Sequence, residues 1–115
     1  MRLLSLLLLF FATPGLTATV HYVEVYNTAR SSIVAFESAP PGTDGFGPVA
    51  LTDFPLQGGG ASATAAFEGS EGCLRDLRIR FADGRVLLHR GFDVCRSATY
   101  HTDRYLRRRA RTPGR

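Results

Sequence analysis

The 115-residue sequence contains no lysine and no tryptophan, its single methionine is Met1, and it has only two cysteines. All 14 side chains of the Lys and Arg class are therefore arginine. Together with abundant alanine and glycine, this is typical of a G+C-rich coding sequence, so the missing lysine needs no functional explanation. The length allows one domain of modest size and excludes a two-domain enzyme.

A long apolar run is also missing. The longest apolar stretch, Leu3–Ala12, has about 10 residues, whereas a membrane-spanning helix needs roughly 20. Arg2 precedes this stretch, and Pro14 and several small residues follow it, which is the order of a secretory signal peptide. A buried N-terminal helix is less favoured, because the stretch has no polar face. The sequence predicts a signal peptide over residues 1–18, no transmembrane anchor, and a secreted or periplasmic protein.

Positive charge is concentrated at the C-terminus. Six of the last twelve residues are arginine and none is acidic, so residues 104–115 carry +6, whereas residues 19–103 carry 7 − 10 = −3. We expect a disordered basic tail that is attracted to an anionic surface such as lipopolysaccharide or phospholipid. A solvated tail with no dedicated partner is the alternative. The expected surface contacts are Arg104, Arg107, Arg108, Arg109 and Arg111.

Between these ends, turn residues interrupt the chain about every ten residues, and the segments between them are rich in β-branched and aromatic side chains. No segment has the apolar period of an amphipathic helix. This pattern predicts an all-β fold over residues 19–103, a small antiparallel β-sandwich of the immunoglobulin-like kind with about seven strands. The expected strand segments are 20–26, 32–38, 49–54, 61–67, 74–81 and 85–89. Gly91 is expected to form a bulge or bend, and the segments 92–95 and 98–102 complete the body.

The clearest strand is Leu74–Phe81, whose second half alternates apolar and arginine side chains. This alternation predicts a half-buried strand with its arginines in water. Asp83-Gly84 follows, and Asp-Gly between two strand-like segments predicts a β-hairpin. Asp76 shares a strand face with Arg78, and we expect it either to pair with an arginine or to accept hydrogen bonds from backbone donors near the hairpin.

The two cysteines, Cys73 and Cys95, flank this hairpin. An even cysteine count in an exported chain predicts a disulfide bond, which would stabilise the fold by about 3 kcal/mol through the unfolded chain. A redox-active pair is the alternative. It is less favoured because the cysteines are not in a Cys-x-x-Cys arrangement.

Several motifs of the body follow one pattern. In chain order it consists of a V-x-V-x-N strand, an S-x-x-x-x-x-x-x-S-P-like stretch, a D-x-W-G loop, a glycine turn, C-x-x-D-L-R, a D-G turn and a terminal D-L-C. The corresponding residues are Val23–Asn27, Ser38–Pro40, Asp44–Gly47, Gly58–Gly60, Cys73–Arg78, Asp83–Gly84 and Asp93–Cys95. By this pattern the chain resembles a family of small exported bacterial proteins of unknown function, with Phe46 in place of tryptophan and Val94 in place of leucine. The resemblance implies a sandwich-like exported domain with a disulfide, and it implies no catalytic residues.

Residues with chemical potential are few. The three histidines, His21, His89 and His101, are not spaced as metal ligands. The glycine run Gly58–Gly60 lacks the Lys-Ser/Thr of a phosphate-binding loop, and no Gly-x-Ser-x-Gly motif is present. We therefore assign no catalytic, metal or cofactor-binding residue and expect no cofactor.

The sequence favours a monomeric, non-enzymatic exported module that binds a partner or associates with the envelope, with the proline- and glycine-rich loop Pro40–Pro48 as its variable surface. One alternative is a small hydrolase or metal-binding protein that uses His89 with Asp93 or His101 with Asp103. Another is a secreted inhibitor or toxin-like factor that uses the basic tail to approach a neighbouring cell.

Overall fold

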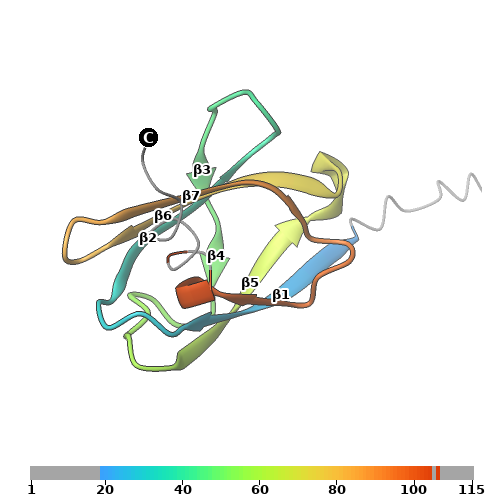
Figure 1. Ribbon diagram of the computed structural model, residues 1–115. Coiled ribbons are helices and arrows are strands. Elements are labelled where there is room, and N and C mark those ends of the chain that lie inside the picture. The colour runs from blue at the N-terminus through green and yellow to red at the C-terminus, as the bar shows by residue number, and fades with distance from the viewer. Residues whose placement is uncertain (1–18, 105, 107–115) are drawn as a thin grey trace, which may run out of the picture.

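The computed structural model describes residues 19–104 and 106, which form a sandwich of two four-stranded sheets (Figure 1). The strands are β1 (Val20–Asn27), β2 (Ile33–Ala39), β3 (Gly47–Pro48), β4 (Ala50–Leu51), β5 (Ala61–Glu68), β6 (Leu74–Phe81), β7 (Val86–Asp93) and β8 (Thr99–His101), and a 3-10 turn, η1 (Gly69–Glu71), joins β5 to β6. One sheet has the order β4-β5-β1-β8 and the other β3-β2-β6-β7. The predicted all-β sandwich is confirmed.

The strand order has two features of its own. All pairs between these strands are antiparallel except β1 with β8, which run parallel. β1 and β2 lie in opposite sheets, whereas the first two strands of an immunoglobulin constant domain share a sheet. The chain thus has the sandwich architecture of immunoglobulin-like domains with a different order of strands.

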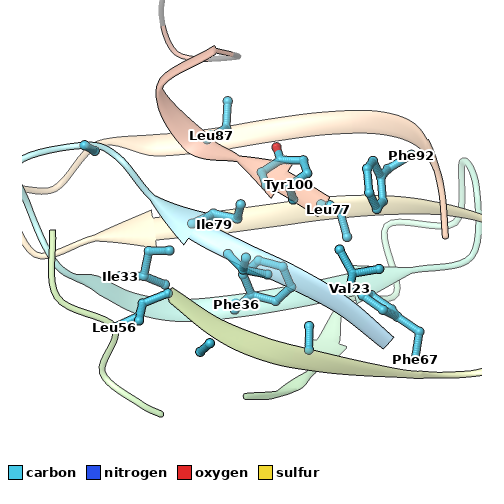
Figure 2. Close-up of a cluster of buried hydrophobic side chains, with 14 of the residues drawn as sticks. Val23, Ile33, Phe36, Leu56, Phe67, Leu77, Ile79, Leu87, Phe92 and Tyr100 are labelled. Carbon is cyan, nitrogen blue, oxygen red and sulfur yellow. The ribbon is translucent and has the colours of Figure 1, made fainter. Parts of the chain in front are cut away.

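The core lies between the two sheets and is built by alternate residues of the long strands (Figure 2). On β1, for example, Val23 and Val25 are buried, while Tyr22, which precedes Val23, is exposed. Phe36 of β2 and Phe67 of β5 meet across the sandwich, with ring centroids 6.4 Å apart. Burying one such side chain contributes about 1.5–3 kcal/mol to the free energy of unfolding. The alternation of apolar residues therefore fixes which face of each strand turns inward.

The predicted hairpin is confirmed as β6 and β7. At its turn Gly84 has φ 91, and the N–H of Arg85 donates to the Asp83 carboxylate over 3.0 Å. The predicted return strand 85–89 is longer in the structure, since β7 runs on to Asp93 and takes in part of the segment 92–95. The bulge expected at Gly91 is confirmed, because Gly91 has φ 74 and the β6–β7 register shifts beside it.

The segment predicted as one strand at 49–54 is divided between the sheets. β3 pairs with β2 in one sheet, and two residues later β4 pairs with β5 in the other. Figure 1 shows this green segment passing from one sheet to the other. Pro48 has no N–H to extend the first pairing, while the N–H of Val49 donates to the carbonyl of Phe36 over 2.9 Å. We call residues 47–51 the crossover segment.

The predicted Cys73–Cys95 disulfide is present, with the two Cα atoms 5.3 Å apart at the open end of the β6–β7 hairpin. The predicted signal peptide, residues 1–18, lies outside the described residues. No helix in the described part of the chain is long and apolar enough to cross a membrane.

Of the predicted surface contacts, Arg104 is exposed in a helical turn after β8. Arg107, Arg108, Arg109 and Arg111 lie outside the described residues. Leu106, which the sequence assigned to the tail, is half-buried and packs against the core.

Candidate functional site

A largely apolar groove opens beside the crossover segment. It has a volume of about 420 Å³ and lies between one edge of β2 and the chain that leaves toward the other sheet. The groove is lined by residues 34–37, 48–51 and Phe54. Glu37 is the only charged residue among them. The arrangement suits the binding of apolar groups rather than an ionic ligand.

The groove exists because β2 is only partly covered along this edge. β3 pairs with β2 at Glu37 and Ser38, and Leu56 forms an isolated bridge with Ile33. Between these two points the crossover segment has already turned away, so no described strand pairs with β2 on this side at Val34. The β2–β6 register also shifts there, which indicates a local irregularity of the kind that marks edges and binding sites.

Exposed apolar side chains gather at this groove. Five large apolar side chains are exposed in the described residues, and two of them, Val34 at 40% and Phe54 at 53%, line it. The other three are spread over different strands and line no part of this groove: Tyr22, Leu74 and Val86. Single exposed apolar residues are ordinary, whereas two that converge on one hollow indicate a surface that a partner can cover.

The loop 40–46 is most of the segment Pro40–Pro48 that the sequence proposed as the variable surface, and it is held against the β6–β7 hairpin. Asp76 is 2% exposed, and its carboxylate accepts from the N–H of Gly42 at 2.9 Å and the N–H of Gly91 at 3.0 Å. Arg90 donates to Asp76 over 2.7 Å and to Asp44 of the loop over 2.9 Å. Two of these four hydrogen bonds, from Gly42 to Asp76 and from Arg90 to Asp44, thus fix the loop to the sheet.

Both roles predicted for Asp76 are found, because it accepts from backbone donors and pairs with an arginine, which is Arg90 of the neighbouring strand β7 and not Arg78 of its own strand. Arg78 instead donates two hydrogen bonds to Glu37 of β2, over 3.0 Å and 3.2 Å. Its guanidinium also lies 4.3 Å from the ring centroid of Phe46, in the same loop. The hydrogen bonds with Glu37 raise the pKa of Arg78, and the pair holds one wall of the groove in place.

The alternation of the strand puts Arg75 on the same face as Leu77 and Ile79, although the arginines of the strand were expected in water. The structure confirms the face and corrects the exposure, because Arg75 is 1% exposed. Its guanidinium donates to the carbonyl of Gly72 over 2.8 Å, to the carbonyl of Glu68, and to the carboxylate of Glu71 over 3.0 Å. It lies on the core side of β6 and anchors the η1 turn. Its position at the apolar period of the strand was the available signal.

The structure places two of the histidines against aromatic rings. His89 Nδ1 lies 3.2 Å from the hydroxyl of Tyr100, and the His89 ring packs edge-on against Phe92. The ring of His101 stacks on Tyr26, with centroids 4.7 Å apart. Of the two carboxylates considered as partners, Asp93 accepts from the backbone N–H groups of Cys95 and Arg96, and Asp103 binds the hydroxyl of Thr28.

Comparisons of this chain with protein-family models, with curated proteins and with solved structures found no match.

Proposed function

We propose that this protein is an exported, non-enzymatic binding module that holds an extended apolar segment of a partner protein in the groove beside the crossover segment. The observation that carries the proposal is the convergence of Val34 and Phe54 on an open groove of about 420 Å³. An edge of β2 forms one side of that groove. A strand edge offers backbone donors and acceptors to an extended peptide, while the apolar hollows take its alternate side chains.

Two further features support a peptide rather than a small molecule. The groove is open rather than enclosed, and the ordered loop 40–46 lies close to it through Phe46, which contacts Arg78, the partner of the lining residue Glu37. The hydrogen bonds that fix this loop, from Gly42 to Asp76 and from Arg90 to Asp44, reduce the ordering entropy that binding would cost. Export is supported by the disulfide, which is common in oxidising compartments.

The test uses phage-displayed peptides selected on the mature chain. We expect enrichment of peptides with apolar residues at alternate positions, and we expect Val34→Ser and Phe54→Ser to weaken their binding at least about tenfold, since each change removes buried apolar contact. Leu74→Ser and Val86→Ser are the matched controls, because both remove an exposed apolar side chain elsewhere.

Equal binding to all four variants, or no enrichment, contradicts the proposal. A different result would assign the groove to a small amphiphile. In that case no peptide is enriched, but the chain binds the dye 1-anilinonaphthalene-8-sulfonate and Phe54→Ser abolishes this binding.

A further inference from the structure

The disulfide has a surface setting that a purely structural bond does not need. Both Cys73 and Cys95 are exposed, each just outside the hairpin that they join. The imidazole of His21 on β1 lies beside them, with its Nε2 3.6 Å from Sγ of Cys95. The contact joins residues 74 positions apart, so no local sequence pattern could indicate it.

The two sulfur atoms are not equivalent. His21 contacts the sulfur of Cys95, and no described contact joins it to the sulfur of Cys73. The other nearby charges are the carboxylate of Asp93, within 4.8 Å of both sulfurs, and the guanidinium of Arg96, which pairs with Asp93 over 3.8 Å. A hydrogen bond from an imidazole N–H stabilises a thiolate, so Cys95 is the better leaving group of the pair.

We propose that Cys73–Cys95 is a reducible bond that exchanges with an external dithiol, with Cys95 as the leaving sulfur and His21 as the positioning residue that stabilises it. A thiolate of the dithiol attacks Sγ of Cys73 and forms a mixed disulfide. The Cys73–Cys95 bond breaks, and its electron pair stays on Cys95, beside His21. The second thiol of the dithiol then displaces Cys73, so the dithiol is oxidised to a disulfide and the protein is reduced to two thiols.

The first test identifies the attacked sulfur. The native mature chain is treated with reduced glutathione, free thiols are alkylated, and the positions are mapped by mass spectrometry. We expect glutathione on Cys73 and the alkyl group on Cys95. Glutathione mainly on Cys95, or equally on both, overturns the proposal. So does a bond that is reduced only in denaturant strong enough to unfold the chain.

The second test measures the role of His21. The rate of reduction by dithiothreitol is compared for the parent chain, His21→Gln and the matched control His101→Gln. The control removes a histidine of β8 that stacks on Tyr26 and has no described contact with either sulfur. We expect a fall of at least about threefold for His21→Gln only. Thermal unfolding of each oxidised variant checks that the fold is intact. Equal rates for all three chains overturn the role of His21.

Discussion

The carboxylate of Asp76 connects three segments of the chain although it is almost completely buried. The N–H of Gly42 is the main cause of a lowered pKa at Asp76, and Arg90 and the N–H of Gly91 act in the same direction against the effect of burial. Because the pKa is lower in the folded chain than in the unfolded chain, ionised Asp76 stabilises the fold above the ordinary pKa of 3.8. That contribution is lost as the pH falls through the lowered value.

Replacing Asp76 with asparagine tests this role. The amide has one acceptor oxygen for three donors, and its own NH₂ group faces donors, so we expect the thermal unfolding midpoint to fall by several degrees at neutral pH. The midpoint of the variant should also depend less on pH below about pH 4 than that of the parent. Asp44→Asn is the control, because it removes only an exposed partner of the same Arg90. Equal midpoints for the two variants would contradict the role of Asp76.

Buried polar residues mark the limit of what the sequence could predict for single positions. The alternation of Leu77, Ile79 and Phe81 was sufficient to place these residues in the core, because burial follows the strand period. The partners of Asp76 and Arg75 depend on the arrangement of loops and turns, which no local pattern specifies.

The turn before β5 is held against the turn after β1 through backbone contacts. The N–H of Gly59 donates to the carbonyl of Ala29, and the N–H of Gly60 donates to the carbonyl of Asn27, each over 2.8 Å. A side chain at Gly58 would place its Cβ under 3.0 Å from the carbonyl oxygens of Ala29 and Arg30. This position therefore requires glycine for close approach of two backbones.

We expect Gly58→Ala to destabilise the fold by about 1–3 kcal/mol, since the two turns must move apart to admit the methyl group. Gly47→Ala is the matched control, because a Cβ there meets nothing within 4 Å, and its effect should stay within about 0.5 kcal/mol. Urea unfolding of both variants measures the difference. A Gly58→Ala variant as stable as Gly47→Ala would show that the turns separate at no cost.

At the level of strands, the long elements were predictable and the crossover was not. β1, β2, β5 and β6 lie within one residue of their predicted bounds, because apolar and β-branched side chains alternate along them. The crossover segment, Gly-Pro-Val-Ala-Leu, overlaps the segment 49–54 that was expected to be one strand, yet it changes sheet after two residues. Which sheet pairs with such a short segment depends on the neighbours β2 and β5, which are distant in the sequence. The groove follows from that change of sheet, so it could not be predicted either.

The charge of the whole molecule is divided between its two parts. Residues 19–103 carry −3 and the tail +6, and only Arg104 of the predicted tail contacts is a described residue. The predicted attraction to an anionic surface is expected to depend mainly on residues 107–115, which contain five of the six arginines of the tail. A chain ending at Leu106 removes these arginines and keeps the apolar side chain that packs against the core.

We expect this shortened chain, with a charge of −3 + 1 = −2, to lose retention on heparin and on phosphatidylcholine vesicles that contain phosphatidylglycerol, while its unfolding midpoint stays unchanged. The parent chain should bind both and be released as salt shortens the Debye length. A variant with lysine at positions 107, 108, 109 and 111 keeps the charge and changes the side chain. If the attraction is electrostatic, this variant binds the surface as the parent does. If the shortened chain is retained as well as the parent, the arginines do not bind the surface. If the shortened chain instead unfolds at a lower temperature, the tail is part of the fold.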